Sequence, residues 1–200
     1  MIIYLVRHGE TIWNRDNLFQ GQSDVELTDL GKSQSEKVAN RLIELGVGSV
    51  HTSPLTRTRY IADRISEGIR TTPIENKGLL ELNLGLLEGK TGKDLRREWP
   101  EIIEDWRKHP SRVAMPSGES FKELHMRSTL ALKEIIKIQT ENPVAIITHN
   151  FVIKVLICEI LGLTVDSLHK IHIGLASISQ LYIDESNSSL GSLNCNEHLN

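Results

Sequence analysis

The sequence predicts an α/β fold, a three-layer α/β/α sandwich whose mostly parallel central sheet has helices on both faces and a small helical insertion. Expected strands alternate with amphipathic helices, a pattern that calls for a sheet covered on both sides. Residues 2–6 and 144–147 are short, wholly apolar runs, typical of strands buried on both faces. The length of 200 residues suits one domain over residues 1–200, with the insertion at about 85–120.

The first strand, residues 2–6, stops abruptly at Arg7, His8 and Gly9. Open parallel sheets bind ligands just beyond the carboxyl ends of their strands, so a cation and an imidazole lie where a ligand is expected. A glycine at position 9 would let a bulky anion approach the backbone. The polar and aromatic residues 12–26 show no sustained period and are expected to form a loop over this site.

The remaining elements follow from caps, stops and periodicity. Helices are expected between Thr28 and Gly46, over residues 55–67, from Thr91 to a break at Pro100, over residues 101–108, from Ser120 to before Pro143, and over residues 151–161. Further strands are expected at residues 49–52, 69–74, 177–183 and 190–193. Ser53 and Pro54 have the form of a helix cap and a first-turn proline, which places Arg57 in the first turn of the helix over residues 55–67.

Five chemically active side chains follow strand or extended segments. His8, Arg57 and His149 come just past strand ends, Arg7 adjoins His8, and Glu81 lies where an extended segment opens into a loop. On the predicted sheet these distant segments converge on one crevice. Because guanidinium groups match phosphate oxygens and offset their charge, the composition of this set indicates a phosphate pocket.

The same set can perform phosphoryl transfer. A neutral imidazole held by a hydrogen bond on its other nitrogen can attack phosphorus, and His8 is our choice because the adjacent glycine gives access. Glu81 could protonate the leaving alkoxide and then take a proton from water, provided that burial and a nearby dianion raise its pKa. Glu88, seven residues further on, could be the acid on chemistry alone. We expect Gln20 and Gly21 of the loop, and Asn150 after His149, to contact the substrate.

Four motifs in this chain resemble those of the histidine phosphatase superfamily, which also contains the cofactor-dependent phosphoglycerate mutases. They are R-H-G-E-T at residues 7–11 with Asn14, S-P-L-T-R-T at residues 53–58, Glu81 in E-L-N-L-G-L-L-E-G, and Thr148-His149. The resemblance covers nearly the whole chain. Asn150 departs from it, because a glycine is common at that position.

The resemblance implies a role for each matching residue. His8 would be the phosphorylated nucleophile, Arg7 and Asn14 would contact phosphate, Arg57 would clamp the phosphoryl group, Glu81 would be the acid and base, and His149 would steady the transferred phosphate. It also implies chemistry that needs no metal, and for the expected phosphatase we assign no cofactor. Since the decision for Glu81 over Glu88 comes from this pattern rather than from spacing, Glu88 stays open on the residues alone.

Other conspicuous residues have simpler interpretations. His169 and His172 have the spacing of a ligand pair, but no matching third ligand follows, so we assign no metal. The basic residues Lys90, Lys93, Arg96 and Arg97 are expected to form a solvated helix face, with a second acidic group of the substrate as the alternative. His198 near the pocket is a minority hypothesis, since terminal segments are usually mobile.

Composition narrows the classes of partner and location. A formal net charge of −3 without a basic block argues against nucleic acid as a main partner. The apolar runs are too short to span a bilayer, so we expect no membrane association. The sequence shows no secretory leader, and Cys158 and Cys195 fit reduced thiols, so we expect a cytoplasmic protein. The expected partner is a small phosphorylated metabolite, and a homodimer is compatible with the sequence.

The main functional hypothesis is a metal-independent phosphomonoester hydrolase that works through a phosphohistidine on His8. The alternative is a phosphoglycerate mutase, which the compact run from residue 85 to 120 disfavours because mutases of this family carry a longer segment after the acid. A third hypothesis is an inactive module that binds phosphate or a protein. The presence of both a candidate nucleophile and a candidate acid speaks against it.

Overall fold

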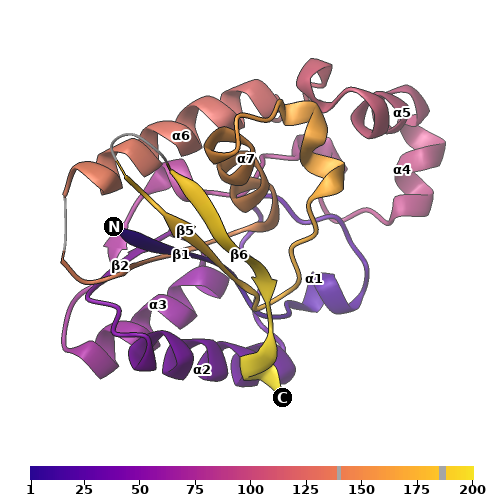
Figure 1. The fold of residues 1–200 in the computed structure, drawn as a ribbon. Coiled ribbons are helices and arrows are strands. Elements are labelled where there is room, and N and C mark those ends of the chain that lie inside the picture. Colours follow the sequence, from indigo (N-terminus) through magenta and orange to yellow (C-terminus); the bar gives the residue numbers. More distant parts are fainter. Residues whose placement is uncertain (139–140, 185–187) are drawn as a thin grey trace.

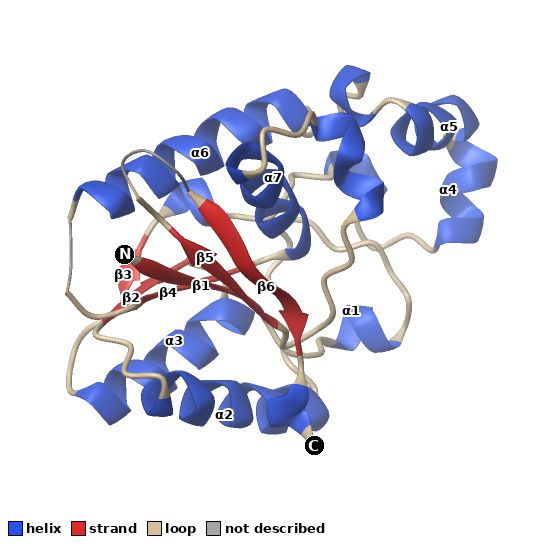
Figure 2. Ribbon diagram, viewed as in Figure 1, coloured by secondary structure: helices blue, strands red, loops and turns tan. Residues whose placement is uncertain are grey.

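The computed structural model describes residues 1–138, 141–184 and 188–200. Within these residues the strands form a six-stranded mixed sheet with helices on both faces, which confirms the predicted α/β sandwich (Figures 1 and 2). The strand order is β3-β2-β4-β1-β5-β6. Strands β1 to β4 are parallel to one another, and β5 pairs antiparallel with both β1 and β6.

The strands are short, and the central ones are buried. Their bounds are β1 Ile2–Arg7, β2 Ser49–Thr52, β3 Ile74–Glu75, β4 Val144–Thr148, β5 Ile178–Tyr182 and β6 Ser189–Cys195. All five residues of β4 are buried, as expected for a strand with a helical layer on each face. The predicted strand over residues 69–74 is wrong, because the preceding helix continues through Ile69 and only Ile74 and Glu75 pair with β2.

The helices lie where caps and periodicity predicted them, with one addition. Their bounds are α1 Ile12–Arg15, α2 Asp29–Glu44, α3 Thr56–Ile69, α4 Gly92–Glu98, α5 Pro100–Lys108, α6 Phe121–Lys137 and α7 Asn150–Ile160. The short helix α1 interrupts the loop expected over residues 12–26, since Thr11 and Asn14 form a capping box there. No helix in the described part of the chain is long and apolar enough to cross a membrane.

The two faces of the sheet support separate cores. Ile3 and Leu5 of β1 pack with α6 and α7, whereas Tyr4 and Val6 pack with α2 and α3, as the alternation of side chains along a strand requires. Figure 2 shows α2 and α3 below the sheet and α6 and α7 above it. Helices α4 and α5 lie apart from these layers, beyond the strand ends (Figure 1). Since Leu95 and Trp106 of this segment join the upper core, we propose that the insertion belongs to one domain with the sheet.

Candidate active site

The strand register brings the predicted site residues to one edge of the sheet. Arg7 pairs with Thr148, so His8 and His149 follow neighbouring strands at the same level. Thr52 of β2 pairs with Ile147 of β4, which places the segment after Thr52 on the other side of His149. The rings of His8 and His149 meet edge to face with centroids 5.3 Å apart. The predicted convergence of these segments is therefore present in the fold.

The His8 imidazole is oriented by the backbone. It is 4% exposed, and its Nδ1 lies 2.8 Å from the carbonyl oxygen of Gly9. Because a carbonyl only accepts hydrogen bonds, Nδ1 carries the proton and Nε2 is left with a free lone pair in the neutral ring. Burial, followed by the positive charges of Arg57 and Arg7, holds the pKa of His8 well below its usual value. The ring is thus neutral at physiological pH, as a nitrogen nucleophile must be.

His149 is fully buried behind His8. Its Nε2 lies 2.8 Å from the hydroxyl of Ser53, and its Nδ1 has no hydrogen-bond partner in the described residues. Burial, and then the charge of Arg57, lowers its pKa well below the usual value. The prediction that Ser53 caps the following helix is wrong, because Leu55 is the N-cap of α3 and Ser53 instead contacts His149.

Arg57 is a buried cation in the first turn of α3. It is 1% exposed, and its guanidinium donates to the carbonyl oxygens of Gly21 at 2.7 Å and Ser23 at 2.8 Å. With the Gln20 amide oxygen turned toward it, Arg57 Nη1 also donates to Gln20 at 2.9 Å. Burial lowers the pKa of Arg57 to about 10. Nearby carboxylates, of which Glu81 has the largest effect, oppose this shift. The loop over residues 20–23 therefore fixes this guanidinium in place.

Arg7 is the second guanidinium of the site, and it is partly buried. Its Nη1 donates to the carbonyl oxygen of Ile173 at 2.7 Å, while its Nε is buried without a partner in the described residues. Burial lowers the pKa of Arg7 to about 10, and Glu81 opposes that shift. Two desolvated cations beside two neutral imidazoles leave an excess of buried positive charge. A dianion bound here would compensate that charge and offer acceptors to the orphaned N–H groups.

Glu81 supplies the only carboxyl among the predicted catalytic residues. It is 4% exposed and accepts hydrogen bonds from the backbone N–H groups of Leu82 at 2.8 Å and Phe151 at 3.2 Å. Burial raises its pKa, and the two N–H groups and then Arg57 and Arg7 act against that rise. A carboxyl whose pKa is raised can hold a proton near neutral pH and donate it, which is the role expected of a general acid.

A cavity of about 370 Å³ opens onto Arg7 and Glu81, whereas His8, Arg57 and His149 are not among the residues that line it. Its lining residues are Arg7, Asn14, Asn17, Leu18, Phe19, Gln20, Glu81, Leu84, Asn150 and Phe151. Arg7 and Glu81 therefore face a space large enough for a phosphoryl group and part of an alcohol. In the described residues no three or more His, Cys, Asp or Glu side chains group as metal ligands would.

Comparison with known families matches residues 3–196 to the model of the histidine phosphatase superfamily, branch 1. The chain belongs to the histidine phosphatase superfamily. The resemblance of its four motifs is thereby confirmed over nearly the whole chain, and with it the assignment to the phosphatases of this superfamily.

Relatives of this histidine phosphatase carry two kinds of name. A probable phosphoglycerate mutase GpmB of Erwinia tasmaniensis is 34% identical over 183 residues, which cover 90% of this chain and 83% of the relative. In fold the chain is similar to Bacillus stearothermophilus YhfR, with a TM-score of 0.92 and 27% identity over 100% of this chain and 99% of the other. A mycobacterial glucosyl-3-phosphoglycerate phosphatase with VO3 gives a TM-score of 0.90 and 26% identity over 98% and 99% of the two chains.

Of the residues of this histidine phosphatase that were expected to contact substrate, three line the cavity and Gly21 does not. Asn14, Gln20 and Asn150 line the cavity. Asn14 accepts from the backbone N–H of Thr11 through its side-chain oxygen, which leaves its amide N–H groups for a ligand. Asn150 is the first residue of α7 and has no positive φ, so an asparagine fits where a glycine is common. Gly21 is buried and uses its carbonyl on Arg57 rather than on the cavity.

The reason predicted for Gly9 is wrong. A Cβ at this position would lie 2.4 Å from the carbonyl oxygen of Gly31 in the first turn of α2. The space beside Gly9 is therefore filled by the backbone of α2 and is not open to an anion. Glycine is needed at position 9 because the chain carrying His8 passes against that helix.

Glu88, the alternative acid, has a structural task. Its two carboxylate oxygens each accept a hydrogen bond of 2.8 Å from the backbone, one from the N–H of Gln22 and one from that of Ser23. These bonds hold the loop whose carbonyls orient Arg57. The chemistry left Glu81 and Glu88 as alternatives. Both accept two backbone hydrogen bonds, and Glu81 differs in that it lines the catalytic cavity, whereas Glu88 does not.

Replacing Glu88 by glutamine should therefore loosen the grip on phosphate while leaving the reacting groups intact. An amide keeps one acceptor and presents an N–H to the other backbone donor, so we expect KM for p-nitrophenyl phosphate to rise about 5- to 20-fold, with kcat changed less. Steady-state kinetics on E88Q checks this. The control is E104Q, because Glu104 is exposed and forms an ion pair with Lys108 on the surface of α5. Equal KM values for both variants would contradict the assigned role.

Arg127 was missed in the sequence, although it interrupts the apolar stripe of α6. Its guanidinium donates to the carbonyl oxygens of Gly78 at 2.9 Å, Leu80 at 2.6 Å and Glu81 at 2.8 Å. The opposite edge pairs with Glu119, which also accepts from the N–H of Asn83. One cation thus ties down the backbone on both sides of the Glu81 side chain. A cation at a buried stripe position was the signal that could have found it.

We expect the variant R127M to lose about 2 kcal/mol of folding stability, because it leaves several carbonyls and Glu119 without their donor. Urea unfolding measures this, with R64M as the control at an exposed ion pair. A displaced Glu81 should also slow hydrolysis of an alkyl phosphate more than that of p-nitrophenyl phosphate. A purely structural role for Arg127 would instead slow both substrates by the same factor.

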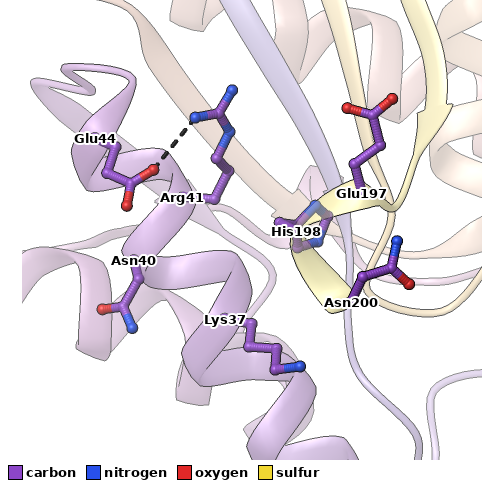
Figure 3. Close-up of a pocket in the computed structure, with 7 residues that line it drawn as sticks. All are labelled: Lys37, Asn40, Arg41, Glu44, Glu197, His198 and Asn200. Atoms are coloured by element: carbon purple, nitrogen blue, oxygen red, sulfur yellow. Dashed lines mark hydrogen bonds and ion pairs between the residues drawn. The ribbon is translucent and has the colours of Figure 1, made fainter.

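His198 and His169 lie outside the catalytic cavity. His198 donates from Nε2 to the carbonyl oxygen of Ala176, whose N–H donates to the carbonyl oxygen of His8. The side chain lines a separate cavity of about 460 Å³ between α2 and the C-terminal segment, where Arg41 pairs with Glu44 (Figure 3). His169 donates to the carbonyl oxygen of Trp106 at 2.8 Å.

Two of the four residues in the basic cluster on the insertion form ion pairs with neighbouring carboxylates. Lys90 forms an ion pair with Glu98, and Arg97 pairs with both Glu98 and Asp94. Asp94, Arg97 and Glu98 lie on the same short helix, α4, and Lys90 lies just before it. The interpretation of this cluster as a solvated helix face is thereby favoured over a role in binding a second acidic group.

Proposed function

We propose that this enzyme hydrolyses a small phosphorylated metabolite through a phosphohistidine on His8, without a metal ion. The observation that carries the proposal is the His8 ring itself, neutral, with its Nδ1 proton fixed on Gly9 and the His149 ring 5.3 Å away. The guanidiniums of Arg7 and Arg57 supply the positive charge that a phosphoryl group in transfer needs.

In the first step, Nε2 of His8 attacks phosphorus and the bond from phosphorus to the alcohol oxygen breaks. The electron pair of that bond stays on the alcohol oxygen, which takes the proton of Glu81 and leaves as a neutral alcohol. Arg7, Arg57 and His149 stabilise the charge on the phosphoryl oxygens. With the hydroxyl of Ser53 donating to Nε2 of His149, Nδ1 of that ring carries a proton for this purpose.

In the second step, water attacks phosphorus, and the bond from phosphorus to Nε2 of His8 breaks. The electron pair returns to Nε2, and the ionised Glu81 takes a proton from the water. Phosphate leaves, and both His8 and Glu81 are back in their starting protonation states. The two steps balance with one ester and one water consumed.

A mutase is the second candidate, because curated relatives at 32% and 34% identity are named probable phosphoglycerate mutases. A mutase must shield its phosphoenzyme from water until the phosphoryl group returns to the substrate. Here the segment between Glu81 and the start of α6 at Phe121 holds the short helices α4 and α5 and two single-turn 3-10 helices, Gly85–Leu87 and Pro110–Arg112. A segment this short offers little shielding of the phosphoenzyme from water. Together with the phosphatase among the structural neighbours, this favours hydrolysis.

Phosphate release from p-nitrophenyl phosphate and a panel of phosphometabolites, measured in excess chelator, tests the proposal. We expect turnover that the chelator does not reduce. Isomerisation of phosphoglycerate faster than phosphate release would favour the mutase. Loss of turnover in chelator, restored by a divalent cation, would contradict the metal-independent step.

A further inference from the structure

A second cavity adjoins the catalytic one and shares two aromatic walls with it. It measures about 320 Å³, and Phe19 and Phe151 line both spaces. The other lining residues are Ile103, Trp106, Arg107, Lys154 and His169. The alcohol portion of an ester whose phosphoryl group lies at His8 therefore has one continuous path, along the two shared phenyl rings.

The aromatic rings that line this second cavity pack against one another. Trp106 packs against Phe19 with ring centroids 5.8 Å apart and against Phe151 at 5.5 Å, and Phe121, which does not line the cavity, contacts both Trp106 and Phe151. Such a surface favours an apolar or planar group over a polyhydroxylated one, because aromatic faces offer area but few hydrogen bonds.

The charged groups of the cavity are all of one sign. Lys154 and Arg107 line it, and no carboxylate does. In the described part of the chain the Lys154 ammonium has no hydrogen bond or ion pair, and its contact is with the Phe151 ring at 5.8 Å from the centroid. Lys154 lies one helical turn beyond Asn150 on α7, so the helix that contributes Asn150 to the catalytic cavity also contributes Lys154 to the second one.

Glu81 is the carboxyl that acts on the charge of Lys154, without an ion pair between the two side chains. Burial lowers the pKa of Lys154, followed by the positive charge of Arg7, while Glu81 and then Cys158 act in the opposite direction. In the proposed first step Glu81 is protonated when substrate binds, so its neutral carboxyl does not balance the charge of Lys154. A half-buried cation with no partner beside an apolar wall is a site for an anion.

We propose that Lys154 is a specificity-determining residue, which binds a carboxylate on the alcohol portion of the substrate while an apolar or planar part of that portion rests on Phe19, Trp106 and Phe151. The inference rests on the proposed function and deepens it, because it names the substrate class as phosphomonoesters of apolar or aromatic hydroxy acids. Arg107, exposed at the mouth of the cavity, adds a second cation to the same end.

Three aryl phosphates of nearly equal shape and leaving-group character test the effect of the charge on the tail of the alcohol portion. They are 4-(carboxymethyl)phenyl phosphate, 4-ethylphenyl phosphate and 4-(2-aminoethyl)phenyl phosphate, which carry a negative, a neutral and a positive tail. We expect kcat/KM for the carboxylate ester to exceed that for the neutral ester about tenfold, with the ammonium ester poorest. In K154M, which keeps the apolar stem, this preference should vanish while turnover of p-nitrophenyl phosphate persists. K122M, at an exposed lysine of α6, should keep the preference.

Calorimetric titration of H8A with the same three esters measures binding without turnover, so the inference can fail or stand apart from the proposed chemistry. We expect the carboxylate ester to bind H8A about tenfold more tightly than the neutral one, and H8A/K154M to bind both alike. Equal affinities of H8A for the two esters would overturn the assignment of Lys154, whatever the turnover. A preference that survives in K154M would overturn it as well. Tighter binding by H8A without turnover by the parent enzyme would count against the proposed hydrolysis alone.

Discussion

The variant H8A should hydrolyse p-nitrophenyl phosphate about 10,000-fold more slowly than the parent enzyme, in the range seen when a covalent nucleophile is removed. No other group can take over its place at the strand end. His149 is the nearest imidazole, but it is fully buried and its Nε2 is bound to Ser53. The measurement is the initial rate of nitrophenolate release, after a thermal melt has shown that H8A is folded.

The matched control is H125A. His125 lies on α6 with Glu159 as its partner and lines a cavity remote from His8, so its removal should leave the rate within about twofold of the parent. Activity in H8A within tenfold of the parent would show that the enzyme does not pass through a phosphoryl group on His8. A large loss in H125A would point to general damage and not to the nucleophile.

The variant E81Q should show an effect that depends on the leaving group. Glu81 protonates the departing alkoxide, so its loss should slow phosphoenzyme formation from an alkyl phosphate about 100- to 10,000-fold. Nitrophenolate leaves without a proton, so the burst of nitrophenolate should persist in E81Q while the following hydrolysis slows. Rapid-mixing kinetics with the two substrates separates these steps. An equal slowing of the burst for both substrates would contradict the acid role.

The pH dependence should follow from the two shifted groups. His8 is reactive when neutral, above its pKa, and burial has moved that pKa down, so the acidic limb of kcat/KM lies well below the usual titration of histidine. Glu81 is active when protonated, below its pKa, and burial has moved that pKa up, so the alkaline limb lies above the usual titration of a carboxyl. For an alkyl phosphate we therefore expect an acidic optimum between them. In E81Q the alkaline limb should disappear.

The sequence predicted the convergence of His8, Arg57 and His149 well, because that prediction needs only the positions of strand ends. Residues that follow parallel strands lie together at the carboxyl edge of the sheet. The parallel register of β1, β4 and β2 brings the segments after these strands together in this way. Helix ends at Thr28 and Ser120 were equally predictable, since their caps are local and each hydroxyl accepts from the backbone N–H three residues later.

What the sequence could not provide were contacts between segments distant along the chain. Ser53 has the form of a helix cap, and only the neighbouring strand shows that its hydroxyl serves His149. Glu81 and Glu88 are chemically equivalent in sequence, and only the fold shows that Glu81 lines the cavity while Glu88 binds the loop N–H groups of Gln22 and Ser23. Periodicity carries no information on which backbone atoms a remote side chain will meet.

Lys154 illustrates the same limit in the candidate binding region. In sequence it is a polar residue within the apolar helix 151–161, which is the ordinary mark of a helix edge that faces solvent. The fold turns this edge toward Phe19 and Trp106, from segments far away in the chain. The basic cluster on the insertion, in contrast, was a candidate for binding a second acidic group, and two of its members, Lys90 and Arg97, form ion pairs with Asp94 and Glu98.

The most direct test of the central claim is to trap the covalent intermediate. The enzyme is mixed with p-nitrophenyl phosphate, quenched in alkali within the first turnover, digested and sequenced by tandem mass spectrometry. We predict one phosphoryl group, stable in alkali and labile in acid, on the peptide that contains His8, and its accumulation in E81Q. A phosphoryl group on His149 or on a hydroxyl, or its absence from quenched enzyme that has released nitrophenolate in a burst, would contradict the account.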